Sequence, residues 1–165
     1  MTVVAMALAL SCCGGTRRVT VTSASTGCPA STPGGPPPPR RALLNFGTPM
    51  ARPSDPRLYG NGVLWTVLPW SNQTIRGAGP AVRMKIPWFR ARTGSVAISA
   101  APLGGPPARF TADVGSPESY GATGFAPSIL HFGRAGCWRL HAQLASHVLT
   151  LVVRVSPPPR TRPAA

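Results

Sequence analysis

The feature that most constrains the fold is a regular alternation of apolar and polar residues near the carboxyl end of the chain. Residues 137–144 read CWRLHAQL and residues 147–155 read HVLTLVVRV. Because successive side chains of a β-strand point to opposite faces, each segment has one face that needs a core and one that faces solvent or a rim. The core positions are Trp138, Leu140, Ala142, Leu144, Leu149, Leu151, Val153 and Val155. The two intervening residues, Ala145 and Ser146, predict a hairpin.

Five further segments have the composition of short strands. They are residues 62–68, 81–88, 95–100, 108–114 and 128–132. Glycine and proline separate them, and none has the 3.6-residue period of a helix. Two of them alternate clearly, with core positions at Val82, Met84, Ile86, Phe110, Ala112 and Val114. About seven short strands and almost no helix predict an antiparallel sandwich or a small barrel.

Proline-rich and polar segments flank the predicted strands. Residues 14–41 end in TPGGPPPPRR, and residues 156–165 read SPPPRTRPAA. Proline favours the extended polyproline conformation and cannot donate a backbone hydrogen bond to a sheet. We therefore expect a disordered linker over 14–41, one folded domain over 42–155 and a disordered tail over 156–165.

The amino end predicts export. Residues 3–10 form an apolar run followed by small residues, Cys12 and Cys13. The run is too short to span a membrane but suits the apolar part of a secretory signal over residues 1–13. A cysteine after such a run resembles the bacterial lipoprotein signal, which makes Cys12 and Cys13 candidate lipidation sites. The basic start of a signal is missing, so a misassigned start or a cytosolic protein is the alternative. We expect a lipid-anchored protein of the cell envelope, or otherwise an extracellular one.

The charge of the chain is strongly unbalanced. The formal net charge is +14, from sixteen arginines and Lys85 against Asp55, Asp113 and Glu118. Such a field attracts phosphates, anionic lipid or an acidic wall polymer. The alternative is drift of a GC-rich coding sequence toward arginine codons. The basic residues are scattered and no aromatic-basic RNA motif occurs, so we expect no specific nucleic-acid partner.

Cys137 and the histidines are the candidates for metal or nucleophile chemistry. His131, His141 and His147 lie near Cys137 in the sequence, but their spacing matches no closed zinc pattern. No carboxylate or amide is placed to orient a cysteine–histidine pair. We therefore predict a structural cysteine, no metal site and no cofactor. A disulfide from Cys137 to Cys28 or to Cys13 is compatible with an exported protein.

The chain has too few acidic residues for catalysis by paired carboxylates, because its three acids lie on three different segments. Phosphate-binding loops, nucleophile elbows and zinc-protease helices are also missing from the sequence. The sequence therefore predicts a protein that is not an enzyme.

The aromatic residues suggest a binding surface. Trp65 and Trp138 fall in predicted strands and are assigned to the core. The proposed site consists of Trp70, Trp88, Phe89, Arg90 and Arg92, which follow prolines at predicted strand ends. Rings beside cations bind glycans or anionic polymers. Packing under a loop is the alternative for these rings.

The carboxyl-terminal half carries a resemblance to a known group. The blocks GFAPS at 124–128, GCW at 136–138 and LTLVVRV at 149–155 resemble those of uncharacterised bacterial secreted proteins and predicted lipoproteins. The upstream segments GVLWTVLPW and KIPWFRARTGSVAISA extend the resemblance over about residues 60–155. It implies an exported immunoglobulin-like β-sandwich and no established activity. Arg139 and His141 depart from the acidic or hydroxyl residues expected there.

These observations lead to one functional expectation. We expect a non-catalytic, exported or lipid-anchored module that binds an anionic polymer or a protein of the cell envelope. The alternative is a periplasmic or extracellular protein that handles copper or zinc through Cys137 and a histidine.

Overall fold

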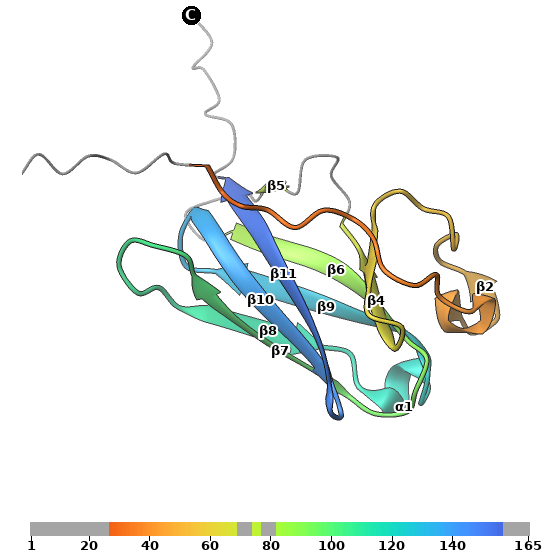
Figure 1. Cartoon of the computed structure of the whole chain (residues 1–165). Coiled ribbons are helices and arrows are strands. Elements are labelled where there is room, and N and C mark those ends of the chain that lie inside the picture. The colour runs from red at the N-terminus through yellow and green to blue at the C-terminus, as the bar shows by residue number, and fades with distance from the viewer. Residues whose placement is uncertain (1–26, 69–73, 77–81, 157–165) are drawn as a thin grey trace, which may run out of the picture.

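Two β-sheets stacked face to face make up most of the folded part of the chain (Figure 1). The computed structural model describes residues 27–68, 74–76 and 82–156. The predicted signal over 1–13 and most of the predicted tail lie outside these residues. The prediction of an all-β fold with antiparallel sheets is confirmed, and the described strands do not close into a barrel.

The larger sheet has five antiparallel strands in the order β3-β4-β6-β9-β8. Their bounds are β3 Leu58–Gly60, β4 Leu64–Val67, β6 Val82–Arg90, β9 Gly124–Phe132 and β8 Phe110–Val114. The smaller sheet has the order β5-β11-β10-β7. Its strands are β5 Thr74–Arg76, β11 His147–Ser156, β10 Gly136–Leu144 and β7 Val96–Pro102. All its pairs are antiparallel except β5 with β11, which run parallel.

Three short elements lie outside the two sheets or at their ends. The 3₁₀ helix η1 (Arg40–Leu43) leads into the hairpin of β1 (Leu44–Asn45) and β2 (Thr48–Pro49). The single-turn helix α1 (Pro117–Tyr120) precedes β9. No helix of the described residues is long and apolar enough to cross a membrane.

The core between the sheets follows the predicted alternation. All eight core positions of β10 and β11 are buried, as are the apolar positions of β6, while Phe110, Ala112 and Val114 of the edge strand β8 are half-buried. At about 25 cal/mol per Å² of buried apolar surface, these side chains supply the main driving force for stacking the sheets. All seven predicted strands are present, and the β10–β11 hairpin turns at Ala145 and Ser146 as predicted.

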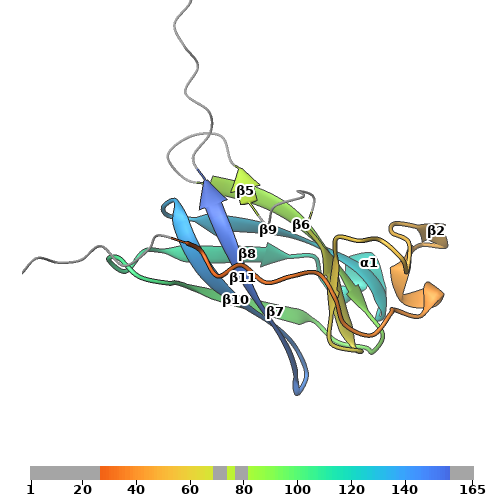
Figure 2. The ribbon, with the colours of Figure 1, turned by 45° about the horizontal axis from the view of Figure 1, so that its top comes forward.

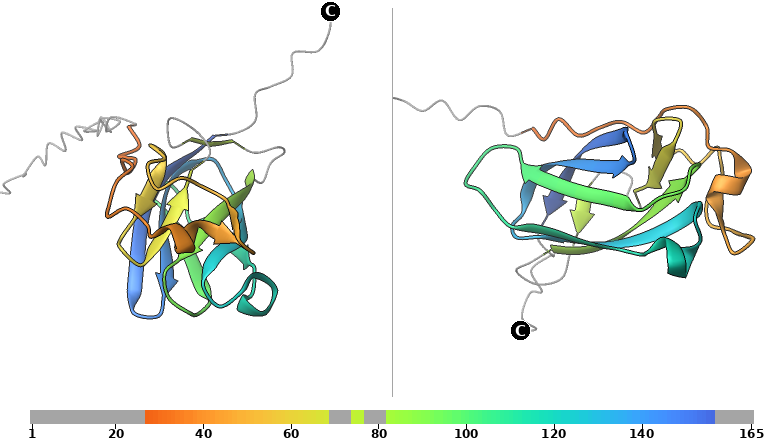
Figure 3. Two further views of the ribbon diagram at one scale, coloured as in Figure 1. Left: turned by 90° about the vertical axis from the view of Figure 1, so that its right-hand side faces the viewer. Right: turned by 90° about the horizontal axis from the view of Figure 1, so that it is seen from below.

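A second, smaller core lies on the outer face of the five-stranded sheet. It consists of Ala42, Leu43, Leu58, Trp65, Val67, Phe89 and Phe125. Helix η1 supplies the first two of these residues and therefore covers one end of the sheet. Figure 3 shows the segment that precedes η1 running along the sandwich to this end.

The predicted linker is therefore part of the folded domain from about residue 28 onward. The backbone N–H of Ser31 donates to the Val152 carbonyl (3.0 Å), and its Oγ accepts from the Val152 N–H (2.8 Å). Further along, Trp65 Nε1 donates to the Pro36 carbonyl at 2.7 Å. Proline lacks a donor but keeps its carbonyl acceptor, and the sandwich uses that acceptor. The predicted domain boundary at residue 42 is thus too late.

Candidate functional site

The aromatic residues of the predicted binding surface are packed inside the domain. Trp88 is fully buried between the sheets, and its Nε1 donates to Ser128 Oγ at 2.9 Å. Phe89 points to the other face of β6 and is fully buried in the second core beneath η1. Their burial agrees with the alternative interpretation, in which these rings pack in the core and do not bind a ligand.

Arg90 is also buried, at 0% exposure, at the end of β6. Its Nη1 donates to the Gly94 carbonyl (2.7 Å) and its Nη2 to the Gly121 carbonyl (2.6 Å). Longer bonds of 3.3 Å reach the carbonyls of Gly124 and Phe125. Burial lowers the pKa of the guanidinium, because desolvation disfavours its charge. Arg90 therefore ties the β6–β7 loop to the start of β9 and presents no cation to a ligand.

Only Arg92 of the described members of that predicted surface is exposed. Trp70, Cys12 and Cys13 lie outside the described residues, so the binding role of Trp70 and the lipidation of the cysteines stay predictions. Trp88, Phe89 and Arg90 do not form the predicted binding surface. The alternation of β6 turns Trp88 and Arg90 inward, and η1 covers Phe89.

Cys137 is joined to Cys28 by a disulfide with a Cα–Cα distance of 5.5 Å. This distance lies within the usual range for disulfides. Of the two pairings left open by the sequence, the structure contains the one with Cys28. An oxidised Cys137 has no thiolate to offer a metal, which removes the sulfur ligand from the copper or zinc alternative.

The histidines lie on separate parts of the surface. His141 Nδ1 is 3.1 Å from Thr150 Oγ1 on the smaller sheet, while His131 Nε2 is 3.3 Å from Asp113 Oδ2 on the larger sheet. Within residues 27–68, 74–76 and 82–156, no three His, Cys, Asp or Glu side chains gather into a potential metal site.

Within the described structure, the outer face of the four-stranded sheet carries exposed basic side chains and no acidic one. Arg139 and Arg154 are exposed on it, and the register pairs them with Val152 and Cys137 respectively. The two arginines are thus diagonal neighbours on adjacent strands. The remaining outward positions of β7 and β10 carry Ala97, Ser99, Ala101, His141 and Gln143. We call the surface of Arg139 and Arg154 the cationic face.

No acidic side chain is available to neutralise the cationic face. The three acids of the chain are Asp55, before β3, Asp113, on β8, and Glu118, on α1. Asp55 is 2.8 Å from Arg57, and the hydrogen bonds that this guanidinium donates to the Asp55 carboxylate lower the pKa of the carboxyl group. Within the described part of the chain, neither Arg139 nor Arg154 has an ion-pair partner.

A cavity of about 660 Å³ continues the cationic face at the disulfide. Arg154, Arg134, Cys28 and Cys137 contribute to its wall. Arg134 is held there by bonds from its guanidinium to the carbonyls of Gly104 and Ala135. The cavity therefore combines one fixed guanidinium with one exposed guanidinium, which is a setting for an anionic group.

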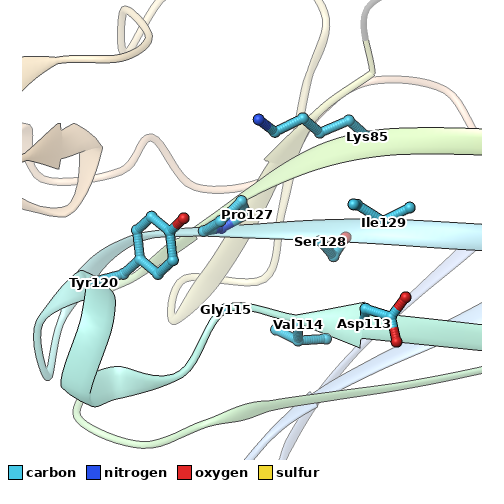
Figure 4. A pocket seen from close by; sticks show the side chains of 8 residues that line it. All are labelled: Lys85, Asp113, Val114, Gly115, Tyr120, Pro127, Ser128 and Ile129. Atoms are coloured by element: carbon cyan, nitrogen blue, oxygen red, sulfur yellow. The ribbon is translucent and has the colours of Figure 1, made fainter.

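A second groove, of about 310 Å³, lies on the opposite sheet (Figure 4). Lys85 and Asp113 lie on its two sides, with Ile129 between them and Tyr120 at one end. Because the Asp113 carboxylate offsets the Lys85 ammonium, this groove does not favour anions. It supplies a matched control for experiments on the cationic face.

Arg134, Arg139 and Arg154 are not among the predicted site residues. The alternation of β10 and β11 does place Arg139 and Arg154 on the outward face, but the register that makes them neighbours comes from the hairpin. Arg134 had no sequence signal, because its place depends on the turn after β7.

Comparisons with protein families, with curated proteins and with solved structures gave no match. The resemblance to secreted bacterial proteins and predicted lipoproteins therefore remains a prediction.

Proposed function

We propose that this protein is a non-catalytic, exported binding module that holds an anionic polymer of the cell envelope on its cationic face. The observation that carries the proposal is the placement of Arg139 and Arg154 as exposed diagonal neighbours on a sheet that has no acidic side chain. An extended polymer of repeated phosphate or carboxylate groups can contact both guanidiniums at once. The cavity with Arg134 extends this surface beyond the sheet.

Strand order supports an immunoglobulin-like sandwich as the finer fold. With β4, β6, β7, β8, β9, β10 and β11 as strands A to G, the larger sheet contains the order A-B-E-D and the smaller the order G-F-C. This is the constant-type immunoglobulin arrangement. The parallel strand β5 then extends the edge next to strand G. Because this fold hosts many unrelated functions, the binding role rests on the cationic face and not on the fold.

Export is supported by the disulfide and by the signal-like amino end. A disulfide persists in oxidising compartments and is rare in the reducing cytosol. Lipidation at Cys12 or Cys13 would then place the cationic face at the membrane–wall boundary. Intact mass of the protein from fractionated bacterial cells tests this part, because lipidation leaves a diacylated cysteine as the first residue.

The binding proposal is tested with polyphosphate as the anionic probe and dextran as the neutral one. Arg139→Gln/Arg154→Gln should weaken polyphosphate binding about tenfold at low salt and flatten the dependence of affinity on salt. The control Arg83→Gln/Lys85→Gln removes the same charge from the opposite sheet. Equal weakening by both double variants would refute the cationic face as the site, since only the net charge would then matter. Equal affinity of the wild type for dextran and polyphosphate would refute anion binding itself.

A further inference from the structure

The hairpin of β1 and β2 projects from the end of the sandwich that carries η1 (Figure 2). Two residues, Phe46 and Gly47, make its turn, and both have positive φ, at 47° and 85°. This pattern is that of a type I′ turn, whose first position normally holds asparagine, aspartate or glycine. A phenylalanine there takes up a left-handed backbone conformation that costs it about 1 kcal/mol or more.

Phe46 gains no packing in return for this conformation. Its side chain is 79% exposed, and Met50, just after β2, is 46% exposed. With Val148 they are the exposed large hydrophobic residues of the described structure. Two of these three therefore occur within five residues, on the same projecting hairpin.

Arginines surround the base of the hairpin. Arg40 and Arg52 line a cavity of about 400 Å³ whose other walls are apolar except for Ser54, and come from Leu43, Leu44, Pro49, Ala51 and Pro53. Arg41, also exposed, lies beside Arg40 on η1. Asp55, the acid nearest in sequence, is paired with Arg57, and Glu118 belongs to α1 rather than to this cavity.

We propose that this hairpin is a docking site for an anionic lipid bilayer, in which Phe46 and Met50 enter the interface and Arg40 and Arg52 bind lipid phosphates. Charge complementarity and shape both support a bilayer as the occupant. An apolar tip with cations behind it matches the order of a bilayer surface, where the acyl boundary lies beneath the phosphates. This site is at the opposite end of the sandwich from the disulfide cavity, so the inference is independent of the proposed function (Figure 1).

The test measures binding of the full-length chain to vesicles of phosphatidylcholine with and without phosphatidylglycerol. Cys12→Ser and Cys13→Ser are included in every protein so that no acyl chain contributes. Phe46→Asn removes the ring but suits the left-handed turn, so the variant should fold at least as well as the wild type. We expect it to bind phosphatidylglycerol vesicles about tenfold more weakly. Arg40→Gln and Arg52→Gln should each cost about fivefold.

Two controls distinguish docking by the hairpin from nonspecific hydrophobic adsorption and from an effect of net charge. Val148→Ser removes a side chain as exposed as Met50 from another hairpin, and Arg83→Gln removes an arginine from the larger sheet. Both should change vesicle binding less than twofold. Unchanged binding of Phe46→Asn, or equal binding to the two vesicle types, would overturn the proposal.

A third arm distinguishes a membrane from soluble ligands. Glycerol phosphate in excess should not displace the protein from vesicles, because it offers no acyl boundary for Phe46. Displacement by glycerol phosphate, or self-association that depends on Phe46 without vesicle binding, would also overturn the proposal. Loss of polyphosphate binding in Arg139→Gln/Arg154→Gln, with the Phe46→Asn effect retained, would show the two sites to be separate.

Discussion

Replacing Arg90 should destabilise the domain rather than weaken ligand binding. The Arg90→Met variant keeps an unbranched apolar side chain but loses the guanidinium and with it every donor. Two of the lost bonds are short, at 2.7 Å to Gly94 and 2.6 Å to Gly121. A hydrogen bond from a charged group contributes about 1.5 to 3 kcal/mol, so these two account for about 3 to 6 kcal/mol. The variant no longer bears the cost of desolvating a charge, which offsets part of this loss. We therefore expect the free energy of unfolding to fall by about 3 to 5 kcal/mol.

The assay is urea unfolding followed by tryptophan fluorescence, with Arg92→Met as the control. Arg92 is exposed two residues further on, so its replacement should change the free energy of unfolding by less than about 0.5 kcal/mol. Arg90→Lys keeps the charge but not the fork of donors, and should fall between the wild type and Arg90→Met. A loss below about 1 kcal/mol in Arg90→Met, or loss of polyphosphate binding by a stably folded Arg90→Met, would refute the structural role.

Three further predictions concern the amino-terminal segment. Cys28→Ser/Cys137→Ser should lower the free energy of unfolding by about 4 to 5 kcal/mol, because the disulfide closes a loop with a sequence separation of 109; urea unfolding that is identical with and without the bond would contradict this. Ser31→Ala should cost about 1 kcal/mol in the same assay, through loss of its Oγ bond. Burial raises the pKa of Tyr59, whose hydroxyl bonds to the Ser31 carbonyl, so the unfolded state loses its proton first and stability should fall as the pH rises above about 10. Tyr59→Phe should reduce that fall, as measured by thermal unfolding at increasing pH.

The strands and the main core could be predicted because a two-residue period directly encodes a buried and an exposed face. The same rule also predicts that Arg90 is buried. Val82, Met84, Ile86 and Trp88 point inward, and two residues on, Arg90 must point inward too. The predicted strand ends at Trp88, two residues before the end of β6, so the prediction leaves Arg90 outside the alternating pattern.

Phe89 could not be placed from its own strand. It lies on the outer face of β6, where alternation alone predicts exposure, and it is buried by residues of η1 that precede it by more than forty positions. That cover comes from a proline-rich segment whose composition resembles a linker. Its contacts use proline carbonyls, a serine hydroxyl and a disulfide, none of which has a periodic sequence signal.

The net charge of +14 overstates the charge available to a ligand. Arg90 donates its hydrogen bonds to four backbone carbonyls, and Arg57 is paired with Asp55. Arg134 donates to the Gly104 carbonyl in the turn after β7. Two groups of exposed arginines then form no ion pair within the described residues, Arg139 and Arg154 on the cationic face and Arg40, Arg41 and Arg52 around the β1–β2 hairpin. The exposed Arg83, Arg92 and Arg109 belong to neither group. Because charges further apart than a Debye length of about 8 Å act almost independently at physiological salt, such groups rather than the total should determine affinity.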